Sequence, residues 1–172
     1  QWNISSTIGS VEINVTHGAQ SMQELCERQM TVRIHSLWLM PAPSDEALLA
    51  GIVGELSGRF GTPLFAPHLT LQGDTETTPA ALEHAITAVA DTVEAFSEPV
   101  TAVEGIESYF RSFYARFAAS APLTTLKRTL DPDDSTPFMP HVSLLYGAVE
   151  PSAKAAAIAE IGARLAGRTI RF

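Results

Sequence analysis

The sequence predicts a fold of mixed strands and helices, α+β or α/β, arranged as two similar lobes. Short segments with strand-like alternation take turns with amphipathic helical segments along the whole chain. In addition, the stretch FAPHLTLQGD (65–74) has the same layout as FMPHVSLLYG (138–147). Histidines in the two stretches are 73 positions apart, close to half the chain, which indicates a duplicated strand-helix unit. We expect each lobe to bury its apolar residues against its own helices.

The first elements are strands. Residues 1–16 alternate loosely in polarity and predict two short strands with a turn at Gly9 and Ser10. Residues 17–30 are polar and indicate a loop with some helical character. Residues 32–40 predict a strand that ends at Pro41, because proline has no backbone N–H to donate.

Helices follow on both sides of the first histidine stretch. Ser44 is a suitable N-cap for a helix that ends near Gly61. The segment PHLTL then predicts a short strand. From Pro79 to about Phe96, apolar residues recur at helical spacing and predict a second amphipathic helix.

The second half repeats this alternation. Residues 100–110 and 112–120 predict a hairpin that turns near Arg111. The remaining expected elements are a helix at 121–130, a strand at 141–145, a helix at 152–166 and a last strand at 168–172.

Length and composition favour one globular domain over residues 1–172. Of its 172 residues 45% are hydrophobic and 17% charged, enough for a substantial core. The formal net charge of −8 argues against binding of long nucleic acids, which need a basic surface to replace counterions. A negative net charge is still compatible with a small nucleotide bound in a local pocket.

The chain contains a single cysteine, Cys26, so no disulfide can form within it. This fits a reducing compartment, and we expect a cytoplasmic monomer. No apolar stretch approaches the ~18 residues needed to span a bilayer, so we expect no membrane association.

The two histidine strands present the same chemistry. Because alternate side chains of a strand share a face, His68 lies beside Thr70, with Leu69 and Leu71 on the opposite face. His141 and Ser143 share a face in the same way. If the two faces meet at a cleft, two imidazoles and two hydroxyls converge there.

This set of side chains suits displacement at phosphorus. One imidazole can take a proton from the attacking oxygen and the other can protonate the leaving oxygen near neutral pH. The hydroxyls of Thr70 and Ser143 can hydrogen-bond the non-bridging phosphate oxygens. This chemistry needs neither a metal nor a cofactor.

Two other interpretations compete with it. A lone histidine in an apolar strand is usually a core residue bonded to backbone, but two matching copies argue against that. A zinc site is disfavoured because neither strand adds a second histidine or carboxylate at ligand spacing, and two ligands make a poor site.

These motifs resemble those of the two-histidine phosphoesterase superfamily, and the chain is most similar to its cyclic phosphodiesterase branch. The resemblance covers residues 30–172 and implies two lobes, each an antiparallel sheet with helices outside, around a central cleft. It implies His68 and His141 as catalytic residues and Thr70 and Ser143 as phosphate-binding residues.

By the same resemblance, Trp38 and Tyr146 line the substrate pocket. The implied reaction is hydrolysis of a small nucleotide cyclic phosphate, either a nucleoside 2′,3′-cyclic phosphate to the 2′-phosphate or ADP-ribose 1″,2″-cyclic phosphate to ADP-ribose 1″-phosphate. Alternatives are a relative acting on RNA ends, such as a 2′-5′ RNA ligase-like esterase or an exonuclease, and a nucleotide-binding module without turnover. The acidic net charge counts against the RNA enzymes. Arg111 and Arg116 are candidates for phosphate contact that the pattern leaves open.

Residues 1–29 lie outside the resemblance. They are either a leader or closing strands of the second lobe moved to the front by circular permutation, with 17–29 as the joining segment. Permutation predicts that residues 2–8 extend the line of the final strand and that Gln1 and Phe172 lie side by side.

Overall fold

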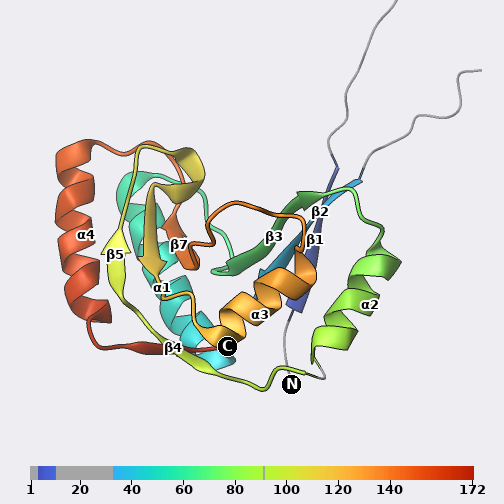
Figure 1. The fold of residues 1–172 in the computed structure, drawn as a ribbon. Coiled ribbons are helices and arrows are strands. Elements are labelled where there is room, and N and C mark those ends of the chain that lie inside the picture. The colour runs from blue at the N-terminus through green and yellow to red at the C-terminus, as the bar shows by residue number, and fades with distance from the viewer. Residues whose placement is uncertain (1–3, 11–32, 91) are drawn as a thin grey trace, which may run out of the picture.

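One antiparallel sheet of six strands runs through both lobes in the order β1-β2-β3-β7-β6-β5 (Figure 1). The computed structural model describes residues 4–10, 33–90 and 92–172. The strands of the sheet are β1 (Ile4–Ser10), β2 (Arg33–Leu39), β3 (Leu69–Thr75), β5 (Ala102–Glu104), β6 (Phe113–Arg116) and β7 (His141–Leu145). The helices are α1 (Pro43–Phe60), α2 (Pro79–Ala90), α3 (Ala121–Leu130) and α4 (Pro151–Leu165), with a short 3₁₀ helix η1 (Tyr109–Arg111).

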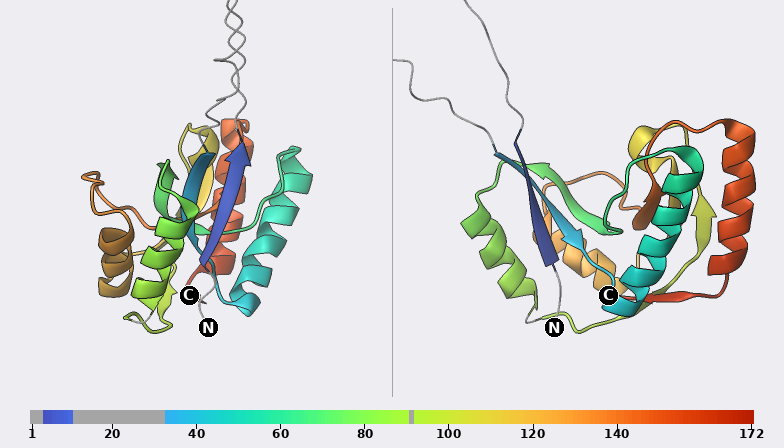
Figure 2. Two further views of the ribbon diagram at one scale, coloured as in Figure 1. Left: turned by 90° about the vertical axis from the view of Figure 1, so that its right-hand side faces the viewer. Right: turned by 180° about the vertical axis from the view of Figure 1, so that it is seen from behind.

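The two predicted lobes are the two halves of this sheet, and the α+β class is confirmed. Strands β1, β2 and β3 carry α2 and α3, while β7, β6 and β5 carry α1 and α4 (Figure 2). The halves meet where β3 pairs with β7, at the partners Leu69 and Val142. The two histidine strands are therefore immediate neighbours in the sheet.

The helices exchange between the lobes, contrary to our expectation. Helix α1 follows β2 in the chain but packs on β7, and α3 follows β6 but packs on β3. The expectation that each lobe is covered by its own helices is therefore wrong for α1 and α3. Sequence periodicity fixes which side of a helix is buried but not which sheet half it covers.

The core lies on the sheet face that carries the leucines of the histidine strands. Leu69, Leu71, Val142 and Leu144 are completely buried there. They pack in one apolar cluster with helix residues, among them Leu49, Ile52, Val53 and Leu56 of α1 and Leu123, Leu126 and Leu130 of α3. The alternation seen in the sequence thus sends leucines to the core and histidines to the other face.

A second, two-stranded sheet lies between the lobes at their base (Figure 1). It pairs β4 (Ser97–Pro99) with β8 (Thr169–Arg171). Beyond this pair, Phe96 and Phe172 exchange both backbone hydrogen bonds, at 3.1 and 2.8 Å. The final strand was predicted from the sequence; β4 was not, because its three residues are too few to show alternation.

Two helix ends differ from the predictions. The N-cap of α1 is Ala42 and no side chain caps it, because Pro43 is already the first helical residue; the Ser44 cap is wrong. Gly61 ends this helix in a left-handed conformation, as predicted. Helix α2 ends at Ala90, short of Phe96.

The N-terminal expectations are tested only in part. Strand β1 pairs with β2 from Ile4–Leu39 to Ser10–Arg33 and runs through the expected turn at Gly9. The second expected strand and the joining segment 17–29 lie outside the described residues. The permuted order and the single-domain boundaries stay predictions. No helix in the described part of the chain is long and apolar enough to cross a membrane.

Because Leu69 is completely buried at the junction of the lobes, we predict that Leu69→Ala lowers the free energy of unfolding in urea by about 2–5 kcal/mol. Leu64→Ala is the control, since Leu64 is 74% exposed and its change should stay within about 0.5 kcal/mol. Equal small losses for both variants would contradict the placement of Leu69.

Candidate active site

Four polar side chains share the sheet face opposite the core: His68, Thr70, His141 and Ser143. We call this the histidine face. Because Leu69 is paired with Val142 in an antiparallel ladder, His68 lies across from Ser143 and Thr70 lies across from His141. The two histidines are then diagonal neighbours, for which Cα separations of about 7–8 Å are usual.

Both imidazoles are held in the same way. Nδ1 of His68 lies 2.7 Å from the carbonyl oxygen of Ala66, and Nδ1 of His141 lies 2.9 Å from that of Met139. A carbonyl oxygen can only accept, so Nδ1 is the donor in each ring and the neutral tautomer carries its lone pair on Nε2. Neither Nε2 has a hydrogen-bond partner among the described residues. Each is free to take or give a proton.

The environment lowers the pKa of both histidines. Burial is the main cause for His68; the Ala66 carbonyl opposes it, and the charge of His141 lowers the pKa further. Burial also dominates for His141, where the Met139 carbonyl raises the pKa and the charge of Arg111 lowers it. A positive charge on His141 thus disfavours a second positive charge on His68.

The two hydroxyls differ in their contacts. The Thr70 side chain is exposed and makes no hydrogen bond within the described residues. The Ser143 hydroxyl donates to the carbonyl oxygen of Phe110 at 3.0 Å. Ser143 therefore also anchors η1 beside the histidine face, a role that the symmetric sequence motif did not indicate.

Trp38 packs directly against His68. Their rings are stacked at 3.7 Å between centroids and 14° between planes. The register explains this contact, because Trp38 is paired with Thr70 and so is a diagonal neighbour of His68. One face of the indole is covered by the imidazole, so Trp38 fixes the orientation of His68.

Tyr146 belongs to an aromatic group on the other side of the histidine face. Its ring stacks on Phe65 at 3.8 Å and meets Phe110 edge-on at 5.4 Å. Phe110 and the neighbouring Tyr109 are 66% and 52% exposed, unusual for aromatic side chains. Burial raises the pKa of Tyr146. Trp38 and Tyr146 thus flank the histidine face from different lobes.

Two further residues near His141 were not predicted as site residues. Tyr114 is buried and meets the His141 ring edge-on at 5.1 Å. Arg111, in the turn that the sequence left open, is close enough for its charge to lower the pKa of His141. The strand register places Tyr114, which is paired with Ser143. Arg111 is placed by η1, which is held to β7 by the hydrogen bond from Ser143 to the Phe110 carbonyl.

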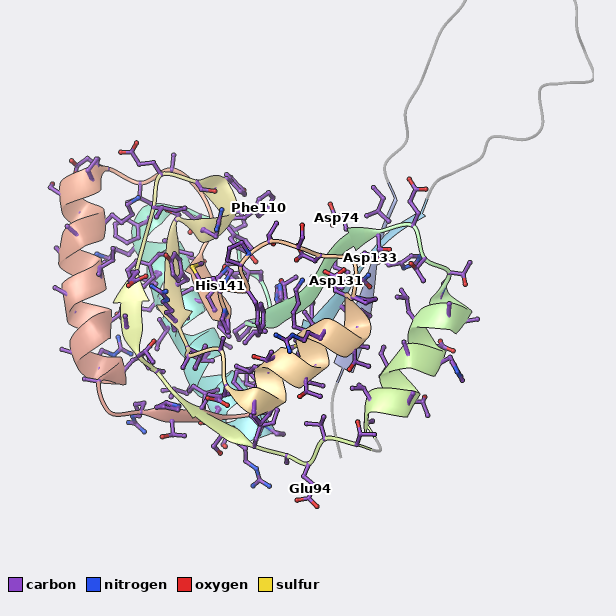
Figure 3. The ribbon with its side chains drawn as sticks, viewed as in Figure 1. Asp74, Glu94, Phe110, Asp131, Asp133 and His141 are labelled. Carbon is purple, nitrogen blue, oxygen red and sulfur yellow. The ribbon has the colours of Figure 1, made fainter. Side chains whose placement is uncertain are left out.

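Acidic residues lie across from this group. Figure 3 shows His141 below Phe110 on one lobe, with Asp74, Asp131 and Asp133 on the facing side. Asp131 and Asp134 both hold Lys127, each at 2.6 Å, so they neutralise a cation there. In the described ranges, no group of three or more His, Cys, Asp or Glu residues could hold a metal ion.

A two-lobed α+β fold with a His-x-(Ser/Thr) pair on each central strand defines the class of the two-histidine phosphoesterases. The chain belongs to the family described as "Cyclic phosphodiesterase-like protein", whose sequence model matches residues 33–168. It is also similar to a "Cyclic phosphodiesterase" from Arabidopsis thaliana, with 23% identity over 117 residues. The alignment covers 66% of this chain and 65% of that protein, so the chain spans about two thirds of its relative's length.

We predict that ¹H–¹³C NMR titrations of the two imidazoles give midpoints below the ordinary value of 6.5. His141→Asn should raise the midpoint of His68 by removing a nearby positive charge, and Arg111→Gln should raise that of His141. Since the unfolded histidines bind protons at higher pH, the free energy of unfolding should fall as the pH drops below about 6.5. A midpoint above 6.5 for either ring would contradict this environment.

Proposed function

We propose that the chain is a metal-independent cyclic phosphodiesterase that hydrolyses a ribose cyclic phosphate, with His68 and His141 as general acid and base. The substrate is a nucleoside 2′,3′-cyclic phosphate, converted to the 2′-phosphate, or ADP-ribose 1″,2″-cyclic phosphate, converted to ADP-ribose 1″-phosphate. Membership of the cyclic phosphodiesterase-like family supports the reaction type.

The matched presentation of the two imidazoles carries this proposal. Each ring has its Nδ1 bonded to the carbonyl two residues before it, and each leaves Nε2 free on the histidine face. Buried polar atoms are normally paired with protein or ordered water, so a ring held only at Nδ1 leaves Nε2 for another partner. Two rings that keep the same nitrogen unpaired, as diagonal neighbours, suit proton transfer on opposite sides of one phosphate.

The reaction proceeds in one displacement at phosphorus. One neutral imidazole accepts a proton at Nε2 from a water molecule, whose oxygen bonds to phosphorus. The bond from phosphorus to the ribose 3′-oxygen breaks, and the second imidazole, protonated at the start, gives its Nε2 proton to that oxygen. The product is the 2′-phosphate, and proton exchange with solvent restores the histidines.

Other residues orient and stabilise the phosphate. Thr70 donates its free hydroxyl to a non-bridging oxygen, and Ser143 does so once its hydroxyl turns from Phe110. The guanidinium of Arg111 favours the anionic substrate beside His141 and the further negative charge of the transition state. Trp38 holds His68, and Tyr146 with its aromatic neighbours forms an apolar wall for the base.

The charges around the site favour a small substrate. Asp74, Asp131 and Asp133 lie across from His141 (Figure 3), and the chain carries a net charge of −8. Asp131 shares Lys127 with Asp134, whereas Asp74 and Asp133 have no cationic partner among the described residues. Their charges disfavour the successive phosphates of an RNA strand more than a single cyclic phosphate, which is a monoanion. We therefore do not propose RNA-end processing or binding without turnover, and the assay below tests for both.

We predict that the purified chain converts 2′,3′-cyclic AMP to 2′-AMP, measured by ion-exchange chromatography, at the same rate with and without EDTA. An RNA oligonucleotide should be unchanged under the same conditions. Shortening of the oligonucleotide would favour the RNA enzymes, and binding of 2′,3′-cyclic AMP without product would favour the binding module. Activity lost in EDTA and restored by zinc would assign the chemistry to a metal.

His68→Ala and His141→Ala should each lower kcat by about 10²–10⁴-fold, the usual contribution of one general acid or base. The wild-type plot of kcat/KM against pH should be bell-shaped. The midpoints of both limbs should lie at lower pH than for unperturbed histidines, because both pKa values are lowered. Thr70→Ala, which removes only one phosphate contact, should lose less. A histidine variant with more than about half of the wild-type rate would refute the two-histidine mechanism.

A further inference from the structure

A cavity of about 420 Å³ adjoins His141 on the side of β5 and β6. It shares two residues with the surroundings of His141: Met139, whose carbonyl holds the ring, and Arg116, which is paired with His141 across the ladder. The proposed mechanism uses neither the cavity nor Arg116. The cavity is lined by Thr101, Ala102, Glu104, Arg116, Phe117, Ala118, Ala119, Phe138, Met139 and Pro140.

Arg116 supplies positive charge to this cavity. Its side chain is 46% exposed, and Nη1 is its only nitrogen with a hydrogen bond in the described part of the chain. That nitrogen contacts the Glu104 carboxylate at 3.4 and 3.5 Å, beyond the usual range of 2.7–3.2 Å for such bonds. Glu104 is also held by the Tyr114 hydroxyl at 3.3 Å. The guanidinium therefore keeps most of its five donors for another acceptor.

Glu104 is the one carboxylate in the lining of this cavity, and it is already engaged by Tyr114 and Arg116; the other lining residues are neutral. The backbone N–H groups of Ala118 and Ala119 have no acceptor among the described residues. Phe117 and Phe138 provide apolar surface on the cavity wall. Apolar walls lower the local dielectric constant and so strengthen the attraction between a guanidinium and an oxyanion. The donors of Arg116 that Glu104 does not occupy are the strongest anion ligands in the lining.

We propose that this cavity binds a second phosphate of the substrate, attached to the 5′-oxygen of the ribose that carries the cyclic phosphate, and that Arg116 is its principal ligand. The proposal rests on the proposed function and deepens it. Arg116 and His141 are paired across the ladder, so their Cα atoms lie about 4.5–5.5 Å apart and their side chains share one face of the sheet. A ribose with its cyclic phosphate at His141 can thus direct its 5′-carbon toward Arg116.

The test compares adenosine 2′,3′-cyclic phosphate with the same compound phosphorylated at its 5′-oxygen. For the wild type we expect kcat/KM to be about 10–100-fold higher for the 5′-phosphorylated substrate, the usual effect of hydrogen bonds to a charged group. Arg116→Gln should reduce this ratio to near one. Arg116→Lys, which keeps the charge but loses the planar fork, should give an intermediate ratio.

The ratio separates binding from a structural role. A variant that merely weakened the fold would lower kcat/KM for both substrates and leave the ratio unchanged. Arg59→Gln is the matched control: Arg59 is similarly exposed, at 40%, and pairs with Glu160 on the helices. Its ratio should equal that of the wild type. Equal loss of the ratio in both glutamine variants would overturn the proposal in favour of a diffuse charge effect.

A binding measurement makes the result independent of turnover. By calorimetry, adenosine 2′,5′-bisphosphate should bind the wild type about 10–100-fold more tightly than adenosine 2′-phosphate, and Arg116→Gln should abolish the difference. If neither cyclic substrate reacts but this difference is seen, the proposed activity fails and the subsite stands. If both substrates react at equal rates and both products bind equally, the activity stands and the subsite is refuted.

Discussion

The pairing of β3 with β7 is the interaction on which the rest of the molecule depends. At Leu69 and Val142 the two halves of the sheet become one, and the same contact sets His68 and His141 as diagonal neighbours on the opposite face. In each of the two strands, successive side chains therefore alternate between the core and the histidine face. A register slip of one residue in either strand would turn the histidine of that strand into the core and its buried aliphatic residues to solvent.

The site is symmetric in its backbone and asymmetric in its surroundings. Both rings use a carbonyl two residues earlier, yet His68 lies under the indole of Trp38 while His141 meets the edge of Tyr114 and the charge of Arg111. Burial lowers the pKa of both rings, but the charge that acts on each differs: His141 acts on His68, and Arg111 acts on His141.

The sequence predicted what depends on local alternation and composition. The two histidine strands, the hairpin around Arg111 and helix α3 follow from such patterns and are observed. It could not predict that α1 and α3 cover the opposite lobes, because periodicity carries no information on partners. The sequence around Arg116 has no regular pattern from which its neighbours could be predicted. Only the strand pairing places it directly across from His141. The prediction of Ser44 as N-cap was wrong because the helix already begins at Pro43, and proline is favoured at the first helical position.

The small β4–β8 sheet connects the two lobes at a second place, apart from the pairing of β3 with β7. The backbone of Arg171 accepts a hydrogen bond from Ala42, on the segment from β2 to α1, and Phe172 bonds to Phe96, on the segment that leads through β4 to the other lobe. The final strand thus fastens two chain segments that pass between the lobes. With two separate connections, one lobe has less freedom to rotate against the other than the β3–β7 pairing alone would leave. The spacing of His68 and His141 across that pairing is restricted in the same way.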